Sequence, residues 1–228
     1  MAQVCADRGY TEVNLNLGCP SGTVTAKGKG SGMLCDPDTL DKFLNDIYSA
    51  APLSISVKSR IGFYSRDEFP ELMEIFNQYP IKELTIHPRI RNAFYSGAVD
   101  AEMFAYAFRN SKVPLCYNGD ITALEQVSSL PPVDAVMIGR GFLADPGLLS
   151  PGGTTLEKLE EFYNALFDAY IQSFGSARNA MFRLKEHWRY LLERLEGAEK
   201  LGKQLRKTTN LNEYKQITHQ IFTQCRYK

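Results

Sequence analysis

Five short apolar segments, each followed by polar or glycine-rich residues, constrain the fold of this chain more than any other feature. They lie at residues 13–17, 53–57, 83–87, 113–117 and 135–138. Amphipathic stretches separate them, at residues 38–48, 68–77, 101–108 and 122–129. Strand-like runs that alternate with helical patterns every 25 to 40 residues or so are typical of βα units around a parallel sheet. We therefore predict an α/β fold for the first 150 residues.

Polar side chains gather where these predicted strands end. They are Asn16 and Cys19, Lys58 and Arg60, His87 and Arg89, Asn118 and Asp120, and Arg140. In βα barrels the active site is built at the C-terminal ends of the strands, in the loops that follow them. The sequence therefore predicts a catalytic site at that rim of the sheet.

A turn-rich segment with Pro151, Gly152 and Gly153 ends this alternation and predicts a domain boundary near residue 150. Three apolar stripes at helical spacing follow, over residues 156–170, 181–195 and 214–221. They predict a small all-helical domain over residues 151–228. Residues 176–228 contain twelve Lys and Arg, five Glu and no Asp, although the chain as a whole has zero net charge. This net charge of +7 indicates a surface that faces a polyanion, with solvated helix faces as the alternative.

The sequence excludes several classes of protein. It has no apolar run near the roughly 20 residues that span a bilayer, and no basic stretch followed by an apolar one near residue 1. We therefore expect a cytoplasmic protein that does not enter a membrane. The five cysteines are odd in number and never spaced as CxxC, so we expect no disulfide framework and no metal site.

One cysteine stands apart from the others. Cys19 lies between Gly18 and Pro20 just past a predicted strand, on a constrained loop at the rim, whereas Cys116 lies inside an apolar run. The glycine-rich residues 28–32 fit neither the Walker pattern nor the dinucleotide fingerprint, and they favour a mobile loop beside the site.

The five strand ends read NLGCP, VKSRIG, TIHPR, YNGDI and MIGRG. In order and spacing these motifs resemble the dihydrouridine synthases, flavin enzymes that reduce uridine in tRNA. The resemblance is close over residues 1 to about 149, and residues 151–228 resemble that family's C-terminal RNA-binding domain more weakly. It implies an FMN-binding βα-barrel domain over residues 1–150 and a helical tRNA-binding domain over residues 151–228. The partner implied is tRNA, and the complete protein is expected to be a monomer.

The resemblance also implies a role for individual residues. Lys58 and His87 match positions beside the isoalloxazine ring, and Cys19 matches the proton donor. The positions expected at the target base or around it are Asn16, Arg60 and Tyr95. The positions that match the FMN phosphate site are Asn118, Gly119, Asp120, Gly139 and Arg140. Taken one at a time, each has an ordinary structural explanation, such as a solvated strand end, a turn or a packed aromatic, but those explanations do not predict five motifs together.

The chemistry that the resemblance implies is a reduction of the C5=C6 bond of uridine. NADPH reduces FMN, reduced FMN gives a hydride to C6, and Cys19 gives a proton to C5. Thiols are still mostly protonated at neutral pH, which suits Cys19 to the role of acid rather than nucleophile. The uridine must be extruded from folded RNA, and the basic residues of 176–228 are expected to hold the phosphates.

The chain departs from the family in one respect. A (β/α)8 barrel of the TIM type has eight strands, and only five βα units precede Pro151. Family members carry three further units before the stretch that corresponds to Met1, so we expect an incomplete barrel with an exposed parallel edge at residues 13–17. A fragment, a misassigned start or a degenerate protein would each explain it.

Two other functions stay open at this stage. An FMN-dependent reductase or dehydrogenase of free pyrimidines is also a flavin barrel, but it would have no use for a basic helical region. A flavin-free RNA-binding remnant would explain the missing units. It would not explain why Cys19, Lys58, His87 and Arg140 are present together.

Overall fold

The computed structural model describes residues 2–228, which pack as two compact units. The first unit contains residues 2–119 and Ser129–Met137, and the second contains Asp120–Ser128 and Ile138–Lys228. The assignment of separate functions to residues 1–150 and 151–228 stays a prediction. In the packing itself, the chain passes between the units three times within residues 119–138.

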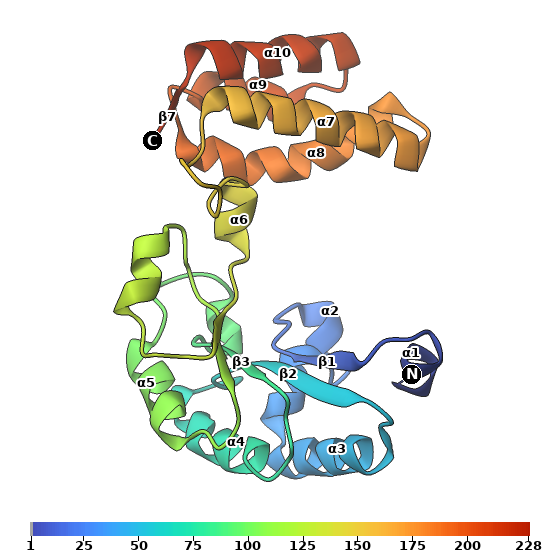
Figure 1. The fold of residues 1–228 in the computed structure, drawn as a ribbon, viewed down its shortest axis with the longest axis vertical. Coiled ribbons are helices and arrows are strands. Elements are labelled where there is room, and N and C mark those ends of the chain that lie inside the picture. The colour runs from blue at the N-terminus through green and yellow to red at the C-terminus, as the bar shows by residue number, and fades with distance from the viewer. Residues whose placement is uncertain (1) are drawn as a thin grey trace. The chain divides into compact units, whose positions relative to one another are not determined.

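The first unit is built on a parallel sheet of five strands that pair in chain order (Figure 1). The strands are β1 (Glu12–Leu17), β2 (Ser54–Arg60), β3 (Leu84–His87), β4 (Leu115–Tyr117) and β5 (Ala135–Val136). Each of the five apolar segments contributes one strand. This confirms the predicted α/β fold, with the strand order expected for part of a TIM-type barrel.

One helix precedes the first strand of this unit and others connect its strands. They are α1 (Ala2–Asp7), α2 (Gly22–Thr25), α3 (Pro37–Ala50), α4 (Phe69–Phe76) and α5 (Ala101–Asn110), with short 3-10 helices η1 (Gly30–Cys35), η2 (Arg66–Glu68) and η3 (Arg91–Ala93). Two of them begin at an aspartate cap. The Asp36 carboxylate accepts from the backbone N–H of Thr39, and the Asp100 carboxylate accepts from that of Met103.

Residues 122–129 do not form the expected fourth amphipathic helix. They contain only a 3-10 helix, η4 (Leu124–Ser129). The Gln126 side chain accepts from the backbone N–H groups of Thr122 and Ala123, at 2.7 and 3.0 Å, and two prolines follow at 131 and 132. Proline cannot donate the hydrogen bond that would continue a helix, so the stretch stays short.

The two faces of the sheet differ in polarity. Side chains alternate between faces along a strand, so Val57, Leu84 and Ile86, which are fully buried, share one face. Tyr117 packs its ring edge-on against Phe104 of α5 on this face, at 4.7 Å between centroids. The opposite face carries polar side chains or a thiol at every strand but the last: Asn14, Asn16, Ser56, Lys58, Arg60, Thr85, His87 and Cys116. The candidate site is therefore an extension of one face of the sheet.

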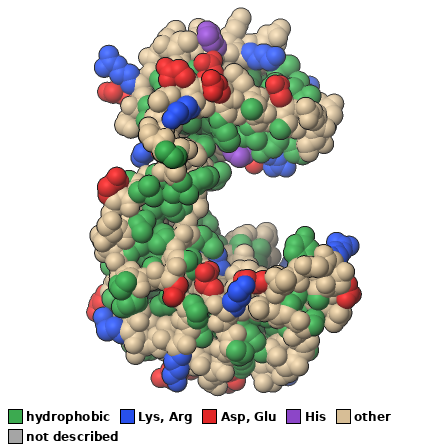
Figure 2. All heavy atoms as spheres, viewed as in Figure 1, with side chains coloured by type: hydrophobic (Ala, Val, Ile, Leu, Met, Phe, Trp, Pro, Cys, Tyr) green, Lys and Arg blue, Asp and Glu red, His purple; other side chains and the backbone are tan. Residues whose placement is uncertain are grey.

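The second unit is mainly helical. After α6 (Arg140–Ala144) it consists of α7 (Leu156–Phe174), α8 (Ala177–Leu191), α9 (Glu199–Lys207) and α10 (Leu211–Gln224), with η5 (Leu192–Arg194) and a two-stranded pairing of β6 (Leu195–Glu196) with β7 (Arg226–Tyr227). The three apolar stripes correspond to α7, α8 and α10. Helix α9 escaped the prediction because Leu201 and Leu205 are its only large apolar residues. On the face seen in Figure 2, this unit shows both acidic and basic side chains, scattered among hydrophobic and other residues.

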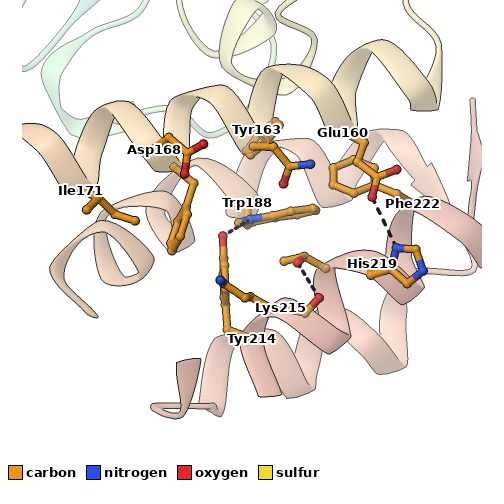
Figure 3. Close-up of a pocket in the computed structure, with 12 residues that line it drawn as sticks. Glu160, Tyr163, Asp168, Ile171, Trp188, Tyr214, Lys215, His219 and Phe222 are labelled. Carbon is orange, nitrogen blue, oxygen red and sulfur yellow. Dashed lines mark hydrogen bonds and ion pairs between the residues drawn. The ribbon is translucent and has the colours of Figure 1, made fainter. Parts of the chain in front are cut away.

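Aromatic side chains fill the centre of the helical unit (Figure 3). The Trp188 indole lies 4.9 Å from the Tyr163 ring and 5.2 Å from the Phe222 ring, measured between centroids. Its Nε1–H donates to the Tyr214 hydroxyl at 3.1 Å, and burial raises the pKa of Tyr214 to about 12. A cavity of about 320 Å³ lies between these rings and a polar rim that includes Glu160 and His219.

The Trp188 hydrogen bond provides a test of this core. Replacing Tyr214 by Phe leaves a buried indole N–H without an acceptor, which should lower the free energy of unfolding by about 1–3 kcal/mol. Urea denaturation followed by the fluorescence of Trp188, the one tryptophan of the chain, measures this loss. The matched control is Tyr170→Phe, whose hydroxyl meets the half-buried His187 at 3.2 Å. Water can replace that contact, so equal losses in the two variants would contradict the assignment.

Candidate functional site

The loop after β1 is organised by the side chain of Asn16. Its Oδ1 accepts hydrogen bonds from the backbone N–H of Gly18 at 3.1 Å and of Cys19 at 3.0 Å. This turn places Cys19, which is partly exposed, directly past the end of the strand. Because Oδ1 is engaged by the loop, the Nδ2 amide of Asn16 is the group that remains for a ligand.

The glycine-rich residues hold the same loop from the other side. Ser31 is fully buried, and both its hydroxyl and its backbone N–H donate to the carbonyl oxygen of Cys19, at 2.8 and 3.0 Å. Gly30 has φ +57°, and a Cβ there would lie 2.8 Å from the same oxygen. Residues 30–35 form the packed helix η1, so this part of the expected mobile loop is a support for Cys19. The sequence did not predict that Ser31 supports the Cys19 loop. The two glycines on either side of Ser31 were the only sequence signal of this close packing.

Arg60 anchors two loops from the end of β2. Its side chain is 1% exposed, its Nε donates to the Gly18 carbonyl at 2.9 Å, and its Nη1 donates to the Ile90 carbonyl at 3.0 Å. The guanidinium also lies over the Tyr95 ring, 5.4 Å from the centroid. Burial lowers the pKa of Arg60. The contacts that the structure shows for Arg60 are therefore with the protein itself.

Lys58 lies on the polar face, level with Asn16 on β1 and with Thr85 on β3. Burial, and then the positive charge of Arg60, lower the pKa of Lys58. Within residues 2–228 the Lys58 ammonium has no hydrogen-bond or ion-pair partner. A half-buried cation without a partner is stabilised by an acceptor or an anion placed beside it. A ligand that places such a group beside Lys58 would therefore stabilise its ammonium.

His87 ends β3 and is 4% exposed. Its Nε2 lies 3.0 Å from Nη1 of Arg89, which is 3% exposed, and the Tyr95 ring lies 5.9 Å from the imidazole. Tyr95 itself is 54% exposed. The structure therefore groups His87 with Arg60, Arg89 and Tyr95 at the rim.

The residues predicted for the phosphate site divide between the two units. Asn118 follows β4 in the first unit, and its Nδ2 donates to the Met137 carbonyl at 2.8 Å. A Cβ on Gly119 would lie 2.8 Å from the Val99 side chain and 3.0 Å from the Tyr117 hydroxyl, so this position needs glycine.

In the second unit, Asp120 and Arg140 form an ion pair of 2.6 Å with both side chains about two-fifths exposed. Such exposed pairs contribute little to stability. Gly139 has open space where a Cβ would project. Gly141, by contrast, packs so closely that a Cβ would lie 2.0 Å from the Ile121 carbonyl oxygen. The two glycines of the GRG motif therefore differ, because Gly141 is required for packing and Gly139 leaves the backbone open.

The other cysteines differ from Cys19 in their surroundings. Burial raises the pKa of Cys116 to about 11, and it also raises the pKa of Cys225 and of Cys35. Cys116 and Cys225 are buried. Cys35 is exposed and Cys5 is partly exposed, but they belong to η1 and α1 rather than to a strand end. Cys19 is the thiol that combines access with a position on the rim.

A second candidate surface lies on α8. Cations of α8 lie over exposed aromatic rings of α8 and of the end of α7: Arg178 and Lys185 lie 5.8 and 5.5 Å from the centroid of Phe182, and Arg183 lies 5.8 Å from that of Phe174, the last residue of α7. A groove of about 770 Å³ runs beside them. Its lining includes Leu143, Phe182, Lys185, Arg189, Tyr190 and Arg206. Cations interleaved with aromatic rings are suited to phosphates and unstacked bases.

Two kinds of feature are absent from residues 2–228. No helix there is long and apolar enough to cross a membrane. No three His, Cys, Asp or Glu side chains of that range gather in the way that a metal site requires.

Comparisons with known proteins bear on the whole chain. Residues 1–226 match the sequence model of the family described as Dihydrouridine synthase (Dus). The chain is 32% identical over 162 residues to tRNA-dihydrouridine synthase B of Pasteurella multocida, an alignment that covers 69% of this chain and 48% of the relative.

Two further relatives align over more of the chain. Probable tRNA-dihydrouridine synthases of Staphylococcus epidermidis and Staphylococcus aureus strain MRSA252 are 29% and 30% identical. The alignments cover 93% and 96% of this chain and 68% and 70% of those relatives. The chain thus spans about half to two thirds of the length of the curated relatives that it matches.

The loop geometry around Cys19 yields a prediction. In an Asn16→Ala variant two backbone N–H groups lose their acceptor. If this lowers the stability of the folded Cys19 loop by about 1 kcal/mol, the fraction of molecules in which the loop is open rises roughly fivefold. Alkylation of Cys19 by iodoacetamide, followed by peptide mass spectrometry with Cys35 as the internal reference, should accelerate by that factor.

The matched control is Asn14→Ala, on the same strand and the same face. Asn14 donates to the Ser56 hydroxyl at 2.9 Å, away from the loop. It should leave alkylation of Cys19 unchanged, and an equal acceleration in both variants would refute the role of Asn16.

Proposed function

Because the chain belongs to the dihydrouridine synthase family, we propose that it reduces a specific uridine of tRNA to 5,6-dihydrouridine, with FMN as cofactor and NADPH as the reductant. One observation carries the proposal. Arg60 ties the loops after β1 and β3 to the end of β2 at the C-terminal rim of the sheet, which holds a partly exposed thiol, Cys19, and the polar face of the same sheet carries a half-buried ammonium without a partner, Lys58. This combination supplies an acid and a cation on one polar face.

The residues of the rim fit a flavin. A reduced isoalloxazine ring is an electron-rich group with acceptor atoms, and the unpartnered Lys58 is the cation that such a ring would stabilise. His87 is the second polar side chain that we assign to the ring. We assign the phosphate to the family's positions Asn118, Gly119, Asp120, Gly139 and Arg140. The close approach at Gly119 and the open backbone at Gly139 support that assignment.

In the reaction, bound FMN in its reduced form supplies the hydride for C6 of the uracil ring. The protein must then manage the negative charge that develops on C5 and the C4 carbonyl of the substrate. Cys19 gives a proton to C5, which completes the saturated bond. We propose that Asn16 contacts the base through its Nδ2 amide, and that Tyr95 contacts the base or its surroundings through its exposed ring. Arg60 acts there through the loops it anchors.

Substrate binding is assigned to the helical unit. The uridine must leave the RNA fold, so contacts to the surrounding phosphates have to hold the tRNA while the base is extruded. Net positive charge on residues 176–228 and the cations over Phe182 and Phe174 support this role for α8. The same surface argues against free pyrimidines as the substrate.

Replacement of Cys19 tests the proposed acid. In the flavin-loaded protein, Cys19→Ala should leave reduction of the flavin by NADPH unchanged, because that step does not use the thiol. Oxidation of the reduced flavin by tRNA should slow by about 10²- to 10⁴-fold, the usual contribution of a general acid. Stopped-flow absorbance at the flavin band measures both steps. Cys35→Ala is the matched control, and a wild-type rate in Cys19→Ala would show that another group donates the proton.

Neutralisation of the α8 cations tests the tRNA surface. Changing Arg178, Arg183, Lys185 and Arg189 to Gln should weaken tRNA binding and lower the slope of log K against log salt by about 0.7 to 0.9 for each phosphate that the protein no longer binds. FMN binding should not change. The control replaces Lys42 and Lys112, exposed lysines of the first unit, by Gln. A salt slope that is unaltered by the four α8 substitutions would place the tRNA contact elsewhere.

A further inference from the structure

His87 and Arg89 form a side-chain hydrogen bond at the end of β3. Both residues are almost completely buried, and Nη1 of Arg89 lies 3.0 Å from Nε2 of His87. The other terminal nitrogen of the guanidinium, Nη2, donates to the Gly97 carbonyl oxygen. The guanidinium is therefore fixed by the loop after β3 and presents a donor to the imidazole.

A guanidinium has five N–H donors and no acceptor. In its hydrogen bond with Arg89, Nε2 of His87 must therefore be the acceptor and carry no proton. A neutral imidazole has one N–H and one bare nitrogen, so the proton of His87 is on Nδ1. Imidazolium, which has a proton on both nitrogens, is incompatible with this contact.

The charges around His87 act in the same direction. Arg60 pairs in register with His87 across the β2–β3 ladder, and its guanidinium lies over the Tyr95 ring that faces the imidazole. Arg60 and Arg89 are also close enough for the charge of Arg89 to lower the pKa of Arg60. Two guanidinium groups beside one imidazole disfavour a third positive charge.

We propose that Arg89 is a positioning residue that holds His87 as the neutral Nδ1–H tautomer. The proposal rests on the function proposed above, where His87 is assigned to the flavin ring, and it specifies what His87 offers there. In this form His87 carries a single N–H, at Nδ1, and no positive charge. It does not provide an exchangeable proton of an imidazolium, which leaves the proton for C5 to Cys19.

The tautomer is directly measurable in the chain without flavin or tRNA. Nitrogen NMR of protein labelled in the imidazole rings separates Nδ1–H, Nε2–H and imidazolium forms by chemical shift. The chain has three histidines, His87, His187 and His219, and the variants His187→Gln and His219→Gln assign the signals of the other two. His87 in the wild-type protein should show a protonated Nδ1 and a bare Nε2 at pH 7. A protonated Nε2 at that pH would overturn the proposal without any further variant.

Substitutions of Arg89 show whether Arg89 is the cause. Arg89→Met removes the donor and the charge, so the His87 signals should move toward the Nε2–H form and the pKa of His87 should rise by about 1 to 3 units. Arg89→Lys keeps the charge and one donor, and it should retain the Nδ1–H form.

Arg91→Met is the matched control. Arg91 is on the same loop and stacks over Phe63 and Phe94 at 5.1 and 5.3 Å, and its loss should not move the His87 signals. An unchanged His87 tautomer and pKa in Arg89→Met, or equal changes in Arg91→Met, would refute the proposal. If Arg89→Met does not fold, the wild-type spectrum still tests the proposal, because a protonated Nε2 on His87 would overturn it. Since no arm of the test uses catalysis, loss of activity in Cys19→Ala and the tautomer of His87 are independent results.

Discussion

A buried guanidinium supports the rim of this sheet. Removing a charge from water is costly unless the charge is hydrogen-bonded, and Arg60 meets this condition with the carbonyl groups of Gly18 and Ile90. Those carbonyls belong to the loops after β1 and β3, so the requirement to satisfy one cation holds both loops to the end of β2, the strand between them. Cys19 lies one residue from the first carbonyl and Tyr95 packs on the guanidinium face. The positions of the predicted catalytic groups thus depend on an arginine that is almost inaccessible to a substrate.

The strands were predictable because their sequence signal is local. A buried parallel strand reads as a short run of apolar residues bounded by turn residues, and five such runs in register with polar strand ends leave few other folds. The positions of Cys19, Lys58 and His87 on one rim follow from topology alone, since parallel strands end at the same edge. Helices α7, α8 and α10 were predictable for a similar reason, because a helix that buries one face repeats its apolar residues every three or four positions.

What escaped prediction depends on contacts between residues far apart in the sequence. The hydrogen bonds from Ser31 to the Cys19 carbonyl span twelve residues, and nothing in the composition of residues 28–32 distinguishes a packed support from a mobile loop. Glu68 is a similar case. Its carboxylate accepts from the backbone N–H groups of Phe63, Tyr64 and Ser65 and shapes the loop after β2, yet its only sequence signal is the Ser65–Glu68 capping box. The sequence correctly predicted that Arg60 lies at the rim. Its burial was not predictable, because it depends on contacts with Gly18 and Ile90, which are far from Arg60 in the sequence.

The same long-range contacts explain how one thiol among five meets the requirements of the acid that we propose. A general acid has to keep its proton in the free protein, give it up when charge develops beside it, and reach the substrate. Cys116 is a poor donor because it is buried within strand β4, and Cys35 belongs to the supporting helix η1. Cys19 gains its position from the Asn16 amide, the Ser31 hydroxyl and the Arg60 guanidinium, all of which bind the loop backbone and leave the sulfur uncommitted. Because three side chains hydrogen-bond to the backbone of this loop, the loop can expose a reactive side chain and still hold it in a defined position.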